Sequence, residues 1–334
     1  AATRVDENGL VNYAEVIGSD IIINGDFATN VNGWTDDSGA TLTWQPDSTC
    51  LVTTTGDSTF AIIPTPNVIE SGKLYKISFR YKPNATGTFR VRGGATVMFS
   101  STTFTVGDWN YVEFIGTSSG ANLEFGAAGG SITNFYIDDI VVKQVDRDNV
   151  PRIDYTGGGC PHILAEPQRT NVITYSEDFS QTNWAKTAQG TGIAPVVTSN
   201  NSVSPNGTLN ADKIVFDTGS GTSGGDISMI QDSVSLSSGI KLTQSVYLKG
   251  SVGGETILMR GAGGGVYQTL TLTNDWVRYE FTETSIATTS YFEFGLRQGL
   301  GGVIINQTIT VYVWGAQFEE GSYATSYIPT SGSS

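Results

Sequence analysis

Short runs of alternating apolar and polar residues recur along the whole chain. In the clearest run, residues 75–82, four apolar side chains (Tyr75, Ile77, Phe79, Tyr81) alternate with four polar ones (Lys76, Ser78, Arg80, Lys82). A period of two is typical of a β-strand that buries one face and exposes the other. Glycine and other turn-forming residues separate the runs, and few long amphipathic stretches occur. We therefore predict an all-β fold.

The pattern also repeats at long range. Residues 108–114 (DWNYVEF) return as residues 275–281 (DWVRYEF), an offset of 167 residues. Lys82 and Lys249 keep the same offset, so the similarity extends well upstream of the motif. Two diverged copies of one domain are the economical explanation. A chain of 334 residues is also expected to contain roughly two domains.

The alternation and the turn residues divide the chain into five parts. We predict a leader at residues 1–19, a first domain at 20–145, a Gly- and Pro-rich connector at 146–170, a second domain at 171–330 and a tail at 331–334. Asn8-Gly9 in the leader indicates a small hairpin. Two similar domains of short strands fit tandem jelly-roll β-sandwiches.

Individual strands can be placed in the first domain. They are predicted at residues 21–23, 42–44, 75–81, 88–92, 111–115, 122–125 and 135–143.

Composition removes several classes of function. The net charge of −14 opposes binding to nucleic acid and to anionic membranes, so neither is expected as a partner. Cys50 and Cys160 do not make a disulfide framework. The one histidine, His162, is interpreted as a loop residue, and it cannot supply a His-based zinc site or a Ser-His-Asp triad to both copies.

The polar positions of the strands are candidates for a binding face. We predict that one outer face of the first domain gathers basic groups, acids and a tyrosine, namely Arg80, Lys82, Arg90, Arg92, Tyr111, Glu113 and Glu124. The corresponding residues of the second domain are Tyr247, Arg278 and Glu280, with Glu293 and Arg297 nearby. Planar charged groups and aromatic rings suit a sugar. The alternative is a solvated, salt-bridged sheet face.

Aromatic residues divide by whether they recur in both copies. Trp34 and Trp184 occupy equivalent loop positions, and so do Trp109 and Trp276 at the start of a strand, which favours packing at the core or its edge. Trp44 has no counterpart and is predicted to be an exposed sugar platform.

Two repeated acid pairs raise the question of hydrolysis. Glu113 with Glu124, and Glu280 with Glu293, have the composition of a glycosidase acid and nucleophile. No glycosidase motif surrounds them, so the protein is not expected to be an enzyme.

The first domain resembles jelly-roll carbohydrate-binding modules of the xylanase-associated type. The resemblance lies in residues 24–34 (NGDF…NGW), 75–81 (YKISFRY) and 135–140 (FYIDDI). It implies a structural Ca²⁺ where the first and last strands meet, with Asn24, Asp26, Asp138 and Asp139 as ligands. The alternative for these acids is the capping of turns.

The connector and second domain resemble virion or tail-fibre proteins of tailed bacteriophages. The similar segments are residues 150–155 (VPRIDY), 166–171 (EPQRTN), 175–184, 314–321 (WGAQFEEG) and 323–330 (YATSYIPT). In that family the leader, residues 2–10 here, lies shortly before the segment at 151–155. The first domain is therefore expected to be an inserted cassette.

This second resemblance implies a function. It indicates a non-enzymatic virion protein, in a tail or head fibre, that binds cell-surface or environmental glycans such as bacterial surface polysaccharide. Other virion proteins are expected partners, and the chain is expected to form a homo-oligomer, as fibres commonly form trimers. Two alternatives are a structural decoration protein and the non-catalytic carbohydrate-binding region of a secreted polysaccharide-degrading enzyme.

Overall fold

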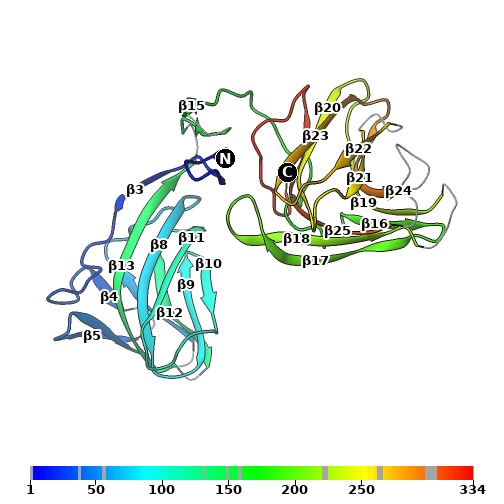
Figure 1. The fold of residues 1–334 in the computed structure, drawn as a ribbon. Helices are drawn as coiled ribbons and strands as arrows, with labels where there is room; N and C mark the ends of the chain where they lie inside the picture. Colours follow the sequence, from blue (N-terminus) through cyan, green and yellow to red (C-terminus); the bar gives the residue numbers. More distant parts are fainter. Residues whose placement is uncertain are drawn as a thin grey trace. The chain divides into compact units, whose positions relative to one another are not determined.

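The computed structural model describes residues 3–36, 39–54, 58–130, 132–147, 150–156, 160–219, 225–261, 266–297 and 307–333. Within these ranges the chain is all β, with no helix that could cross a membrane. The chain forms two compact units (Figure 1). One is Glu15–Val150, and the other joins Ala1–Ala14 to Pro151–Ser334.

The unit of residues 15–150, the first sandwich, consists of two sheets. Its strands are β3 (Val16–Asp20), β4 (Trp34–Asp36), β5 (Thr41–Gln45), β6 (Thr49–Thr53), β7 (Ser58–Pro64), β8 (Leu74–Pro83), β9 (Gly87–Gly93), β10 (Thr96–Ser101), β11 (Asn110–Thr117), β12 (Leu123–Gly130) and β13 (Asn134–Asp146). One sheet has the order β10-β9-β12-β7-β4, and the other has the order β11-β8-β13-β6-β5, with β3 also paired to β13.

The core of the first sandwich lies between these sheets. The apolar residues of β8, Tyr75 to Tyr81 at alternate positions, are buried, which confirms the predicted faces of that strand. Tyr81 stacks on Phe89 of β9, with ring centroids 4.1 Å apart. Trp34 is also buried in this core, as its recurrence predicts. Burial of such large rings is the main stabilising contribution available to the sandwich.

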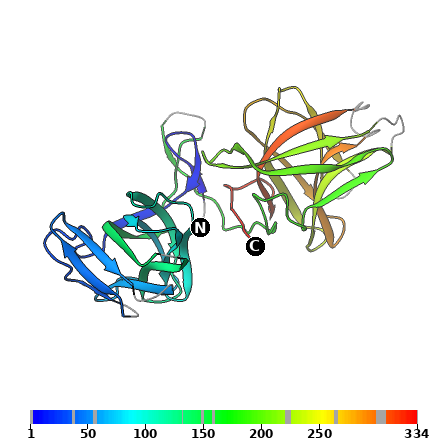
Figure 2. The same ribbon diagram turned by 90° about the horizontal axis from the view of Figure 1, so that it is seen from below.

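The other unit contains the second sandwich. Its strands are β16 (Ala185–Gln189), β17 (Ile193–Val203), β18 (Leu209–Asp217), β19 (Ile227–Ser235), β20 (Lys241–Gly250), β21 (Thr256–Arg260), β22 (Tyr267–Thr271), β23 (Val277–Thr284), β24 (Thr289–Arg297) and β25 (Thr308–Glu320). The sheet orders are β22-β21-β24-β19-β16 and β23-β20-β25-β18-β17. They reproduce the orders of the first sandwich strand for strand. Figure 2 shows the strands of this sandwich, coloured from green to red, from a second direction.

Strand register confirms that the two sandwiches are copies. Arg80 lies opposite Tyr111 in the first, and Tyr247 lies opposite Arg278 in the second. Both members of this pair are displaced by the 167 residues that separate the sequence motifs. The cation and the aromatic ring have exchanged strands between the copies. The prediction of two tandem β-sandwiches is therefore correct.

A bulge in the last strand is a second shared feature. Two residues of β13 lie opposite one residue of β8, and two residues of β25 lie opposite one residue of β20. The bulge contains a left-handed residue in each copy, Asp139 with φ 52° and Gly315 with φ 65°. Aspartate tolerates this conformation better than most residues with a side chain. The bulge determines which side chains meet across the centre of each sheet.

The segment at residues 21–23 does not form the predicted strand. The strand lies just before it, in β3, and the Asp20 carboxylate then accepts the backbone N–H of Ile22. The chain continues into a turn in which the Gly25 carbonyl accepts the N–H of Ile140, 2.9 Å away. A Cβ at Gly25 would lie 2.0 Å from the Ile140 carbonyl oxygen. The backbone conformation of residues 21–25 is therefore determined by their contact with the bulge, although the three apolar residues at 21–23 suggested a strand.

The predicted leader hairpin is present and packs within the second unit. Strands β1 (Thr3–Val5) and β2 (Val11–Tyr13) pair around a turn in which Gly9 has φ 79°. The connector adds β14 (Ile153–Asp154) and β15 (His162–Ile163). The carboxylate of Asp154 accepts the N–H of Val5 at 2.8 Å. The first sandwich is therefore inserted between two segments of one discontinuous unit.

Asp232 is a charged group inside the second sandwich. It lies on β19 and is 7% exposed, and burial raises the pKa of its carboxyl to about 6. This pKa lies above that of an aspartate in the unfolded chain, so the folded protein binds the proton more tightly than the unfolded chain does. The contribution of Asp232 to the free energy of unfolding is therefore fully present only below about pH 4. That contribution is lost as the pH rises through 6.

Asp232→Asn should therefore stabilise the protein at pH 8 and leave it nearly unchanged at pH 4. The raised pKa corresponds to roughly 2–3 kcal/mol at pH 8. Thermal unfolding of both proteins across this pH range measures the effect, with the exposed Asp275→Asn as control. An equal effect of Asp232→Asn at both pH values would contradict the assignment.

Candidate functional site

The structure separates residues that were predicted to share one face. Strands β8 and β9 belong to opposite sheets, so Arg90 and Arg92 lie on the outer face away from Arg80. Glu124 lies with them, 3.6 Å from Arg92. Alternation shows which side chains point outward, but not which sheet a strand joins. The predicted single face was therefore wrong for Arg90, Arg92 and Glu124.

The outer face of β11-β8-β13 keeps the remaining residues together. The guanidinium of Arg80 binds the carboxylate of Asp138 and lies 3.0 Å from that of Asp139. The Asp138 side chain is 4% exposed, and burial raises the pKa of its carboxyl although Arg80 opposes this. Arg80 also lies under the ring of Trp109, 4.6 Å from its centroid. Arg80 therefore fixes the position of this ring.

A groove of about 330 Å³ lies beside this cluster. Trp109 and Tyr136 line it, together with Lys82, whose amine is 5.9 Å from the Tyr136 centroid. Gln45 at the end of β5 adds an amide, and Asp47 in the turn that follows adds a carboxylate. Of these five residues only Lys82 was predicted for the site. The outward position of Tyr136 opposite Lys82 follows from alternation once the two strands are known to pair.

A second hollow, of about 530 Å³, shares Trp109 with the groove. Tyr111 lines this hollow and is 69% exposed, so its ring is available to a ligand. Glu113 lies 2.9 Å from the amine of Lys76, and this hydrogen bond is the main cause that lowers the pKa of the Glu113 carboxyl. Phe99 and Ser101 of β10 also line this hollow, which therefore lies at the edge of the sandwich between strands of the two sheets.

Trp44 does not belong to this surface. It lies opposite Cys50 across β5 and β6, and Cys50 is in the core, so the indole is on the core side of the sheet edge. The ring is 37% exposed, and its N–H donates to the carbonyl of Phe27 at 2.8 Å. Trp109, which the sequence assigned to packing, lines the groove instead.

The predicted residues of the second sandwich also divide between faces. Tyr247, Arg278 and Glu280 belong to the sheet of β20 and β23, whereas Glu293 and Arg297 lie on β24 of the opposite sheet. Glu293 is buried 2.7 Å from Arg260, and the Arg297 guanidinium lies 5.6 Å from the Tyr267 centroid. Trp184 is fully buried, as predicted.

The same division applies to the two acid pairs. Glu113 is separated from Glu124, and Glu280 from Glu293, because the members of each pair are on strands of opposite sheets. No substrate bond can lie between two carboxylates that face away from each other across a sandwich.

Three of the four predicted calcium ligands, Asn24, Asp138 and Asp139, bind other protein groups. The turn after β3 does meet the last strand, where the Gly25 carbonyl accepts the N–H of Ile140. The Asn24 amide donates to the carbonyls of Asn30 and Asn32, and both Asp138 and Asp139 contact Arg80. Over the described ranges no cluster of three His, Cys, Asp or Glu side chains is present. Calcium here stays a prediction.

Comparison with known proteins gives only distant similarity. No protein-family model matches the chain, and neither does any curated protein sequence. The CBM22-1-CBM22-2 tandem domain of Paenibacillus barcinonensis Xyn10C aligns over 93% of this chain and 100% of its own, with 14% identity and a TM-score of 0.34. The CBM22-1-GH10 modules of Clostridium thermocellum Xyn10B, complexed with xylohexaose, align over 41% of this chain and 30% of theirs, with 16% identity and a TM-score of 0.31. Similarities this low carry no argument about the ligand.

Arg80→Gln would leave the buried Asp138 carboxylate without its cation. We expect a loss of about 2 kcal/mol, less than the full value for a buried ion pair because Arg80 is 38% exposed. Urea unfolding measures this loss. Lys76→Gln, which removes a more exposed pair, should cost under about 0.5 kcal/mol. Adding Asp138→Asn to Arg80→Gln should restore most of the stability, and a double variant as unstable as Arg80→Gln would contradict this role.

Proposed function

We propose that the outer face of β11-β8-β13 in the first sandwich binds a glycan. The observation that carries this proposal is the groove in which Trp109 and Tyr136 flank Lys82. An aromatic ring can stack on the apolar C–H face of a pyranose, while amine, amide and carboxylate groups bind its hydroxyls. Lys82, Gln45 and Asp47 supply one group of each kind.

The site is held in shape before any ligand arrives. Arg80 contacts Trp109 on one side and Asp138 and Asp139 on the other, so the indole is positioned by an ion-pair cluster. A positioned ring loses little conformational entropy on binding, which favours affinity from a small contact area. In this role Arg80 supports the platform and does not need to touch the sugar.

We propose a non-catalytic role for this face. Glycoside hydrolysis needs one carboxyl that keeps its proton near neutral pH and a second carboxylate within about 10 Å. The hydrogen bond from Lys76 lowers the pKa of Glu113, which makes this acid a poor proton donor. Its sequence partner, Glu124, belongs to the opposite sheet.

We also propose that the chain is part of a phage fibre, where many weak sites of this kind would act together through avidity. The proposal of a phage fibre rests on the sequence segments that resemble virion proteins. It is supported by the way these segments fold as one group, since Arg152 and Ser326 both bind Glu166. Peptide mass spectrometry of purified particles of the encoding phage tests it, and particles that lack the protein would favour the alternative of a secreted enzyme's carbohydrate-binding region.

The binding proposal is tested with a glycan array and then by calorimetry on the glycan that binds. Trp109→Ala and Tyr136→Ala should each weaken binding roughly tenfold, equivalent to about 1.4 kcal/mol. Tyr323→Ala, which removes an exposed tyrosine of the other unit, is the matched control and should bind normally. Repeating the array with EDTA tests the calcium prediction. Binding that survives both groove variants would place the site elsewhere.

A further inference from the structure

The sheet face of the second sandwich that corresponds to the proposed glycan face is covered. The hairpin β1–β2, the connector strands β14 and β15 and residues 324–327 lie over strands β20 and β23, within the same unit. They leave a pocket of about 710 Å³ above Tyr247, Trp276 and Arg278. This volume lies in the usual range of small-ligand sites, roughly 300–1,000 Å³.

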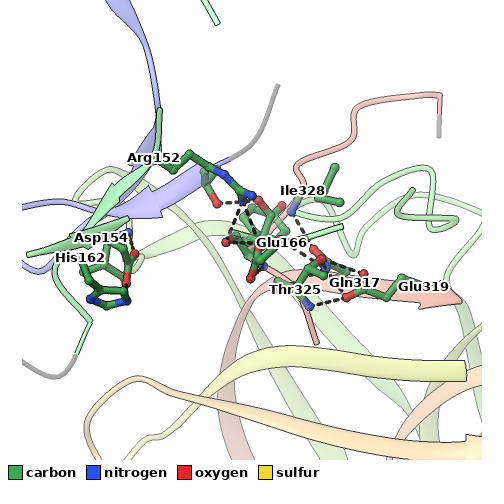
Figure 3. A network of polar contacts seen from close by, with 12 residues as sticks. Arg152, Asp154, His162, Glu166, Gln317, Glu319, Thr325 and Ile328 are labelled. Carbon is green, nitrogen blue, oxygen red and sulfur yellow. Dashed lines mark hydrogen bonds and ion pairs between the residues drawn. The ribbon is translucent and has the colours of Figure 1, made fainter. Parts of the chain in front are cut away.

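A hydrogen-bonded network holds the walls of this pocket (Figure 3). The Glu166 carboxylate accepts the Ser326 N–H at 3.0 Å and the Arg152 guanidinium at 2.7 Å. The Glu319 carboxylate, which is fully buried, accepts the N–H of Thr325 at 2.8 Å. The closing segment is thereby tied to both the connector and β25. The pocket is a built feature of the unit rather than a gap between loosely packed loops.

The charged groups that line the pocket differ in whether they are paired. The Glu166 carboxylate binds Arg152, the Asp154 carboxylate lies 3.7 Å from His162, and Arg4 lies 4.0 Å from Glu7. For Arg278, by contrast, the part of the chain that the structure describes places no carboxylate within 4.0 Å. Its guanidinium donates only to the Thr325 carbonyl at 2.7 Å and to the Ser245 hydroxyl at 2.9 Å.

Neighbouring groups complete a recognition set. The Arg278 guanidinium lies 5.5 Å from the centroid of the Tyr247 ring. The Tyr247 hydroxyl has no hydrogen-bond partner among the described residues, so it is available to donate to a ligand. The Trp276 ring is half-buried, and its N–H donates to the Val203 carbonyl at 2.9 Å, which fixes its orientation.

We infer that this pocket binds a sugar that carries a carboxylate, such as a uronic or sialic acid. Among the described residues, three N–H groups of Arg278 have no partner, one on each terminal nitrogen and the buried Nε–H, and no carboxylate neutralises the charge. The two terminal N–H groups and the planar guanidinium suit a carboxylate. The two aromatic rings supply surface for the sugar ring. The site is separate from the groove of the first sandwich, so its ligand is independent of the glycan proposed there.

Isothermal titration calorimetry on the full chain tests this inference, with Trp109→Ala introduced to silence the groove. The probes are trigalacturonate and 3′-sialyllactose, and the neutral matches are the trigalacturonate methyl ester and lactose. We expect at least one acidic probe to bind, and its neutral match to bind roughly tenfold more weakly or not at all. No heat of binding from either acidic probe up to about 10 mM would overturn the inference.

Variants then locate the bound acid. Arg278→Gln should weaken binding about tenfold, and Tyr247→Phe, which removes only the unpartnered hydroxyl, about threefold. Arg297→Gln on the opposite sheet should bind like the parent protein. Because Arg278 also contacts Thr325 and Ser245, thermal unfolding of each variant shows whether the fold is intact. A folded Tyr247→Phe and a folded Arg278→Gln that both bind with parent affinity would exclude this pocket.

Discussion

The bulge in the last strand of each sandwich is the constraint on which both sheet faces depend. It adds one residue to the central strand, so that Arg80 meets Asp138 in the first copy and Tyr247 meets Trp314 in the second. Aspartate occupies the left-handed position in one copy and glycine in the other. The acids near the end of the first sandwich are therefore explained by the bulge and its arginine, and this arginine in turn orients the tryptophan of the groove.

Sequence periodicity predicted the strand faces well because burial imposes a period of two on each strand separately. The inward positions of β8 and the hairpin at Asn8-Gly9 follow from local patterns, and the two copies follow from the repeat at 167 residues. Periodicity carried no information about which strands share a sheet, and for that reason Arg90, Arg92 and Glu124 were placed on the wrong face. Trp109 was assigned to packing because it recurs, yet a recurrent residue at a strand start can contact a cation and a ligand as well.

The two copies show how one sheet face can acquire different environments. In the first sandwich the face is open, and aromatic rings border a shallow groove. In the second, segments from outside the sandwich cover the equivalent face and enclose a pocket. The covering segments come from the chain on either side of residues 15–150, and the open copy is the one that these segments flank in the sequence. An exchange of Arg and Tyr between paired strands preserves the character of both faces while changing the position of the charge.

The account depends most directly on the chain being a discontinuous unit that carries an independent insert. Replacement of residues 15–150 by a short Gly-Ser linker tests this. Differential scanning calorimetry of the full chain should show two transitions, and the shortened chain and the isolated fragment 15–150 should each reproduce one of them as a single cooperative transition. A shortened chain without a cooperative transition would show that the hairpin, the connector and the second sandwich do not form one unit, and would contradict the account.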